Sequence, residues 1–220
     1  MTDFRAKLTI FDLDKTLAFC NVSFVFGRYL YKTGRLSFRH MLFLVCAYFL
    51  HKIHILSVGR LHQCAFGSVF SKKSEAEVAR LVQEFLHVHG DSLFRDEVKK
   101  RLEQVQKEGG IVWIQSSSPF CIVKPIADLL GVSLVTATRY GLDSLGLYSH
   151  VVEVVQGSTK KRMLDAHAKE HKISLQEVTA YSDSRLDIPL LQAVGTPIAV
   201  CPDRKLQKLA HKHSWQVLQL

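Results

Sequence analysis

The segment Leu8–Leu17, LTIFDLDKTL, constrains the fold of this chain more than any other stretch. A run of apolar and β-branched residues leads directly into Asp12, and Asp14 follows after one apolar residue. This pattern predicts a buried β-strand that ends in two carboxylates. Side chains two positions apart in a strand point to the same side. We therefore expect Asp12 and Asp14 to emerge together at the end of a strand, where open α/β sheets bind their ligands.

Two neighbouring carboxylates repel each other and destabilise a protein unless a positive charge neutralises them. A hard divalent cation that binds oxygen ligands meets this need, and Mg²⁺ fits such a site best. An ordinary surface turn after a strand can also contain Asp, Lys and Thr, so the motif by itself leaves both interpretations open.

The composition indicates a folded globular protein with an anionic partner. With 220 residues, 47% hydrophobic and 22% charged, the chain can bury one core and a smaller insertion. The net charge of +9 favours a phosphorylated metabolite, an acidic lipid surface or nucleic acid. Basic residues are scattered rather than gathered in an aromatic-studded stripe, so we expect no nucleic-acid partner. Five cysteines without a CxxC pair indicate reduced thiols and a cytoplasmic location.

The order of predicted elements indicates an α/β fold. Helical patterns dominate residues 19–107, where the apolar run Met41–Leu50 is too short to span a bilayer. From Ile111 onward strands and helices alternate, which predicts a doubly wound parallel sheet. We expect residues 1–18 and 108–220 to form the α/β core and residues 19–107 an inserted helical cap. Strands are expected at 111–115, 133–137, 178–182, 197–201 and 215–218, helices at 23–32, 37–55, 74–89, 91–107, 121–130, 158–171, 186–193 and 206–213, and a hairpin within 140–155.

Three later stretches place polar residues after a strand or at a helix start. Ser116 follows the strand IVWIQ, where a hydroxyl and nearby N–H groups can hold a phosphate or form an ordinary turn. Lys160 opens a basic helix, which by itself is the usual pattern of a solvated face. Asp183 ends another strand and Asp187 follows four residues on, so that one could bind a metal and the other orient it.

In chain order, FDLDKTL, IQSSSP, GSTKKRML and YSDSRLDIPLL resemble the four motifs of the haloacid dehalogenase-like hydrolases. The chain is similar to subfamily IB, the branch that contains the phosphoserine phosphatases, and AVCPDRKL resembles the segment that follows the fourth motif there. This resemblance implies a Rossmann-like core with a C1-type helical cap. It also implies Mg²⁺-dependent hydrolysis of a phosphate monoester.

The resemblance assigns the reacting groups. Asp12 is then the nucleophile that forms an aspartyl-phosphate, and Asp14 is the general acid and base. The carboxylates of Asp12 and Asp183 and the backbone carbonyl of Asp14 hold Mg²⁺. The phosphate-binding residues are Ser116, Ser117 and Lys160, and the supporting residues are Thr16 and Asp187. Lys161 is the alternative to Lys160 as the lysine of the third motif.

Two departures from the branch bear on metal and substrate. Ser182 stands where the family often has glycine before the fourth-motif Asp, and this small residue should preserve metal binding. The stretch after Thr16, LAFCNVSFVFGRYL, lacks the glutamate with which phosphoserine phosphatases usually bind the substrate amine. This absence argues against phosphoserine as the substrate.

The cap is rich in apolar and aromatic residues, which allows two interpretations. These residues either form the core of a small helical unit or meet an acyl chain or bilayer, with cap arginines and lysines facing anionic headgroups. The second interpretation makes the chain similar to membrane-associated members of the branch that act on phosphatidylglycerophosphate, with peripheral contact at the inner face of a membrane. A non-catalytic basic binding module is a distant alternative, because Asp12, Asp14 and Asp183 are all retained. We expect a phosphorylated small-molecule or lipid substrate and no obligate protein partner.

Overall fold

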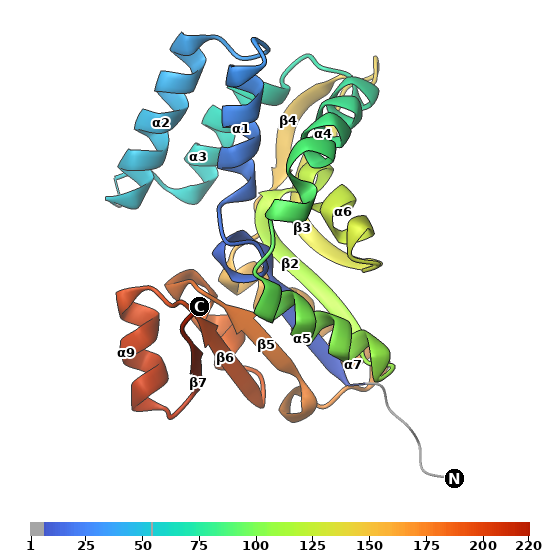
Figure 1. The fold of residues 1–220 in the computed structure, drawn as a ribbon, viewed down its shortest axis with the longest axis vertical. Helices are drawn as coiled ribbons and strands as arrows, with labels where there is room; N and C mark the ends of the chain where they lie inside the picture. The colour runs from blue at the N-terminus through green and yellow to red at the C-terminus, as the bar shows by residue number, and fades with distance from the viewer. Residues whose placement is uncertain (1–6, 54) are drawn as a thin grey trace.

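The sheet is built around β1 (Leu8–Asp12). In the computed structural model, which describes residues 7–53 and 55–220, β1 is the middle strand of a seven-stranded sheet with the order β4-β3-β2-β1-β5-β6-β7 (Figure 1). The other strands are β2 (Ile111–Pro119), β3 (Leu134–Leu142), β4 (Tyr148–Glu153), β5 (Thr179–Ser182), β6 (Thr196–Val200) and β7 (Gln216–Leu218). Neighbouring strands run parallel except β4, which pairs antiparallel with β3 at one edge.

The sheet is buried on both faces, and every residue of β1 is buried, as a run of apolar and β-branched residues predicts. Ile10 packs on one face with Leu164 of α7 (Gly157–His171). Phe11 points to the opposite face and stacks on Tyr181 of β5, with ring centroids 4.6 Å apart. Successive residues of one strand thus supply two separate cores, because side chains alternate between the faces. The prediction of an α/β fold with a doubly wound, mainly parallel sheet is confirmed.

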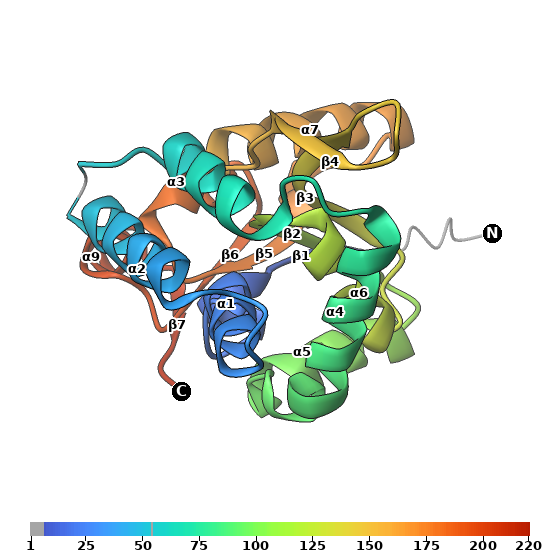
Figure 2. The same ribbon diagram turned by 90° about the horizontal axis from the view of Figure 1, so that it is seen from above.

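Five α-helices of the described chain lie between β1 and β2 in sequence: α1 (Val22–Lys32), α2 (Phe38–Lys52), α3 (Val58–Ala65), α4 (Glu75–His89) and α5 (Asp96–Lys107). Of these, α1, α2 and α3 lie together beyond one end of the sheet (Figures 1 and 2). Each of α1 to α4 begins after a polar residue whose side chain accepts a hydrogen bond from the helix backbone. These N-cap residues are Asn21, Ser37, Ser57 and Ser74.

The predicted helices in this region are present with shifted ends, but the sequence did not predict α3. A short helix of eight residues carries too few apolar repeats to stand out from a loop. No helix in the described part of the chain has both the length and the apolar character needed to cross a membrane. The division into a core of 1–18 and 108–220 and a cap of 19–107 stays a prediction, and residues 1–6 lie outside the described part.

The remaining helices are α6 (Phe120–Leu129), α7, α8 (Ile188–Leu191) and α9 (Arg204–Lys212). The predicted hairpin is present as β3 and β4, with one correction. The strand expected at 133–137 and the first arm of the hairpin are a single strand, because the residues from Arg139 to Leu142 continue β3 while pairing with β4. This edge hairpin makes the sheet mixed rather than wholly parallel.

Candidate active site

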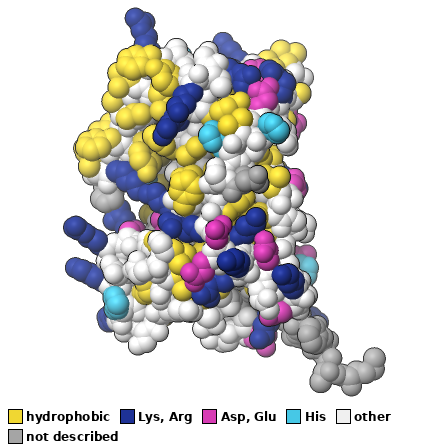
Figure 3. Space-filling model, in the orientation of Figure 1, with side chains coloured by type: hydrophobic (Ala, Val, Ile, Leu, Met, Phe, Trp, Pro, Cys, Tyr) yellow, Lys and Arg dark blue, Asp and Glu magenta, His cyan; other side chains and the backbone are white. Residues whose placement is uncertain are grey.

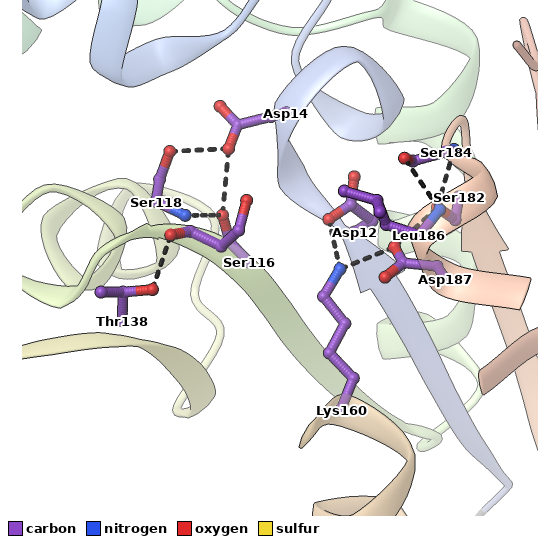
Figure 4. A network of polar contacts seen from close by, with 11 residues as sticks. Asp12, Asp14, Ser116, Ser118, Thr138, Lys160, Ser182, Ser184, Leu186 and Asp187 are labelled. Carbon is purple, nitrogen blue, oxygen red and sulfur yellow. Dashed lines mark hydrogen bonds and ion pairs between the residues drawn. The ribbon is translucent and has the colours of Figure 1, made fainter. Parts of the chain in front are cut away.

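Polar residues of the first, second and fourth motifs lie at the carboxyl ends of three adjacent parallel strands. Asp12 ends β1, which pairs with β2 on one side and β5 on the other. Ser116 to Ser118 lie in the last part of β2, and Asp183 directly follows β5. Segments more than 100 residues apart in sequence therefore meet at one edge of the sheet, as Figure 4 shows.

Lys160 is the buried centre of this cluster. Its Nζ donates to Oδ1 of Asp12 and to Oδ2 of Asp187, each at 2.7 Å (Figure 4). The Ser182 hydroxyl also donates to Oδ2 of Asp187, at 2.7 Å. Lys161 instead forms an ion pair on the surface of its own helix. The structure therefore brings Lys160, and not Lys161, to Asp12, and it places Asp187 where it can position Lys160.

Lys160 reaches the cluster because the start of α7 lies directly against the turn that carries Asp187. A Cβ atom at Gly157, the first residue of the helix, would lie 1.7 Å from the carbonyl oxygen of Leu186. Only glycine permits this approach between two backbones. The first turn of α7 then directs Lys160 towards β1.

Asp14 forms a second buried group with residues of β2 and the start of α1. Its carboxylate accepts hydrogen bonds from the Ser118 hydroxyl at 2.6 Å, the Val22 N–H at 2.7 Å and the Ser116 hydroxyl at 3.2 Å (Figure 4). Ser116 is fully buried and faces Asp14, whereas Ser117 and Ser118 line the pocket beside the carboxylates. A phosphate-binding role for Ser116 and Ser117 stays a prediction. Thr16 is fully buried, and its hydroxyl has no partner within the described residues.

The site holds more negative than positive charge. Burial raises the pKa of Asp12, and the carboxylates of Asp187, Asp183 and Asp14 raise it further, against the opposing effect of Lys160. Burial also raises the pKa of Asp183, to about 7. Four carboxylates, against the buried ammonium of Lys160 and the more exposed ones of Lys15 and Lys52, thus create an environment that favours a bound cation.

The donor set fits Mg²⁺. The carboxylate of Asp183 has no hydrogen-bond or ion-pair partner among the residues described. Within the same residues no group of three or more His, Cys, Asp or Glu side chains is arranged to hold a metal. The Mg²⁺ ligands predicted from the sequence include only two carboxylates, those of Asp12 and Asp183. The third protein ligand is the backbone carbonyl of Asp14, so no group of three acidic side chains is required. Oxygen donors with excess negative charge are what Mg²⁺ prefers.

The carboxylates open into a cavity of about 220 Å³ that continues between the sheet and the first helices. Beyond the polar end its walls are mainly apolar. The apolar lining residues include Phe24, Phe26, Met41, Leu44, Val69 and Phe70. His62 of α3 also lines the cavity, and its Nδ1 lies 3.0 Å from the Tyr140 hydroxyl. Burial lowers the pKa of His62 to about 4, so the ring is neutral at pH 7.

Sequence reasoning missed Ser118, His62 and Tyr140. Ser118 belongs to the same serine run as Ser116, but the sequence does not show which hydroxyl faces Asp14. His62 and Tyr140 are 78 residues apart in sequence, and no local pattern indicates their contact.

Comparison with known proteins places this geometry in a family. A family model for haloacid dehalogenase-like hydrolases matches residues 9–192. The "Inhibition of morphological differentiation protein" of Streptomyces azureus is 32% identical over 215 residues, covering 94% of this chain and 76% of that protein. This chain belongs to the haloacid dehalogenase-like hydrolases. Phosphoserine phosphatase SerB1 of Mycobacterium tuberculosis is 28% identical over 217 residues, covering 94% of this chain and 68% of its own length. Histidinol-phosphatase of Neisseria meningitidis is 27% identical over 232 residues, covering 96% of this chain and 98% of that protein.

Solved structures show the same haloacid dehalogenase-like fold. A Bordetella pertussis protein of unknown function superposes with a TM-score of 0.86 at 23% identity, covering 97% of this chain and 98% of that one. A substrate-bound phosphoserine phosphatase superposes with a TM-score of 0.73 at 17% identity, covering 99% of this chain and 95% of that one. The chain is thus a phosphoric monoester hydrolase of the phosphoserine phosphatase-like branch.

Proposed function

We propose that this hydrolase is a Mg²⁺-dependent phosphatase that forms an aspartyl-phosphate at Asp12. The observation that carries the proposal is the buried Lys160 bridge between Asp12 and Asp187, in a cavity that also contains Asp14 and Asp183. An ammonium 2.7 Å from the nucleophile holds that carboxylate in place and stabilises negative charge on a phosphoryl group beside it.

In the first step a carboxylate oxygen of Asp12 attacks phosphorus, and the bond from phosphorus to the leaving oxygen breaks. Asp14 gives its proton to that oxygen, a role helped by burial, which raises the pKa of Asp14. In the second step water attacks the phosphorus, gives a proton to Asp14 and releases Asp12 and inorganic phosphate. When bound by Asp12, Asp183 and the Asp14 carbonyl, Mg²⁺ supplies the positive charge that lets one anion approach another.

Phosphate release from 4-nitrophenyl phosphate tests this mechanism. We expect activity that EDTA abolishes and added Mg²⁺ restores, and a loss on the order of 10⁶-fold in Asp12→Asn, since removing the nucleophile of a catalytic triad costs about this much. Asp165→Asn is the matched control, because Asp165 pairs with Lys161 on the surface. Turnover that survives both EDTA and Asp12→Asn would exclude the mechanism.

A lipid phosphate monoester is the second candidate substrate, and the outer surface of α2 favours it. Large apolar side chains are exposed along this helix: Phe38, Leu42, Phe43, Val45, Phe49 and Leu50. Figure 3 shows hydrophobic side chains gathered over the region of α1 and α2, with Lys and Arg side chains among them. An apolar helix surface with nearby cations is suited to an anionic bilayer surface. The apolar walls of the cavity would also accommodate part of an acyl chain.

Sedimentation with phosphatidylglycerol vesicles tests this candidate. The double variant Phe43→Ser and Phe49→Ser should bind vesicles at least about tenfold more weakly, since each buried aromatic ring contributes about 1–2 kcal/mol. Leu145→Ser is the control, because this residue is 80% exposed but lies in the β3–β4 turn. A wild-type protein that does not pellet with vesicles would remove the lipid candidate and leave the phosphatase mechanism intact.

A further inference from the structure

Lys15 occupies a backbone conformation that favours glycine. It lies between Asp14 and Thr16 with φ 62° and ψ 1°, in the left-handed region. Few residues other than glycine adopt this conformation, and strained backbone clusters at functional sites. Lys15 lines the same cavity as Asp12 and Asp14.

Lys52, the last residue of α2, lines this cavity from the helical side. Its Nζ lies 5.6 Å from the centre of the Tyr48 ring, one turn earlier on the same helix. Burial lowers the pKa of Lys52, and the positive charge of Lys15 lowers it further. Both lysines line the cavity together with Tyr48, Lys15 from the turn that follows β1 and Lys52 from α2.

This lysine pair has no adjacent counter-ion. Across residues 7–53 and 55–220, neither Lys15 nor Lys52 forms an ion pair, whereas Lys73 and Lys124 pair with carboxylates one turn away. The carboxylate of Asp183 acts on both lysines and that of Asp203 acts on Lys52, each from outside ion-pair distance. Lys15 is half-buried and Lys52 is exposed, and two nearby ammonium groups repel each other unless an anion binds between them.

We propose that Lys15 and Lys52 form a second anion subsite, which binds a further anionic group of the substrate beside its phosphate monoester. The inference rests on the proposed phosphatase function and adds the substrate class to it. Lys15 directly follows Asp14, the proton donor to the leaving oxygen, so the second anion belongs to the leaving group. Its chemistry is that of a carboxylate on a soluble metabolite or a phosphodiester in a lipid headgroup.

Two matched pairs of substrates test the subsite and distinguish these sources. In the soluble pair, 3-phosphoglycerate differs from glycerol 3-phosphate by its carboxylate. In the lipid pair, short-chain phosphatidylglycerophosphate differs from short-chain phosphatidic acid by its phosphodiester. We expect wild-type kcat/KM to favour the second-anion member of at least one pair by about tenfold, the usual contribution of one charge-assisted hydrogen bond.

Lys52→Gln should raise the KM of that favoured member about tenfold and leave the KM of its counterpart, which lacks the second anion, within about twofold. Lys15→Gly should do the same, and because glycine suits the left-handed backbone, a loss cannot be ascribed to unfolding. Lys32→Gln is the control: it removes one positive charge from the exposed end of α1, outside the cavity. Preference within the soluble pair identifies a carboxylate, and preference within the lipid pair a phosphodiester.

An equal KM increase for both members of each pair would mean that the lysines only offset Asp183, and would overturn the subsite. So would a wild-type enzyme with no preference in either pair. Calorimetric binding of the same four ligands to Asp12→Asn protein gives a reading that does not depend on turnover. If wild type hydrolyses neither 4-nitrophenyl phosphate nor these ligands, but the second-anion ligands still bind more tightly through Lys52, the phosphatase mechanism fails and the subsite stands.

Discussion

His62 links the stability of the protein to pH, because the fold holds this histidine in its neutral form. The ring is 9% exposed, and its Nδ1 shares a hydrogen bond with the Tyr140 hydroxyl. Burial lowers the pKa of His62 from 6.5 to about 4, and the nearby charge of His51 lowers it further against an opposing contact with the Ser117 backbone. The contact joins α3 to β3 across the cavity.

The sign and size of the effect follow from linkage. Between pH 6.5 and pH 4 the unfolded chain binds a proton at His62 that the folded chain does not, so the free energy of unfolding falls as the pH is lowered. The contribution of His62 is complete above pH 6.5. With these two pKa values, about 2 kcal/mol of it is lost between pH 7.5 and pH 5.

Urea unfolding at pH 7.5 and pH 5, for wild type and His62→Gln, measures this contribution. Glutamine keeps a polar group near Tyr140 but does not titrate, so the free energy of unfolding should fall about 2 kcal/mol less in the variant. The carboxylates titrate in both proteins and cancel in the difference. His87→Gln, on the exposed side of α4, controls for the loss of a histidine. A pH sensitivity that is the same in wild type and His62→Gln would refute the reasoning.

Two further predictions concern the start of α7. Gly157→Ala places a Cβ 1.7 Å from the carbonyl of Leu186, so we expect a loss of about 2–4 kcal/mol in urea unfolding, together with lower phosphatase activity as the helix start moves. Gly59→Ala, where a Cβ meets nothing within 4 Å, should be neutral or stabilising by up to about 1 kcal/mol, and equal losses in both variants would contradict this. Lys160→Met should lower kcat for an aryl phosphate on the order of 10³-fold, whereas Lys161→Met should change it less than about twofold. Similar losses in the two lysine variants would contradict the assignment of Lys160.

The sequence predicted the central part of the fold because its evidence there is local. The run into Asp12 is apolar except for the β-branched Thr9, which is the pattern of a strand buried on both faces, and β1 is that strand. The alternation of strands and helices after Ile111 predicted the parallel sheet in the same way. Where local evidence was weak, as for the short α3 or the continuation of β3 into the hairpin, the prediction was incomplete.

The sequence by itself determined which chemical groups the chain carries and which predicted strands they follow, since a strand pattern and the residues after it are local features of the sequence. The tertiary structure alone decided which of those groups touch. In the folded protein Lys160, and not Lys161, donates to Asp12. The Ser118 hydroxyl donates to Asp14, and Lys15 lies near Lys52. These contacts depend on how segments far apart in the chain pack against each other. Neighbouring residues of a helix point in different directions, so the packing of the helix decides which of them reaches the site.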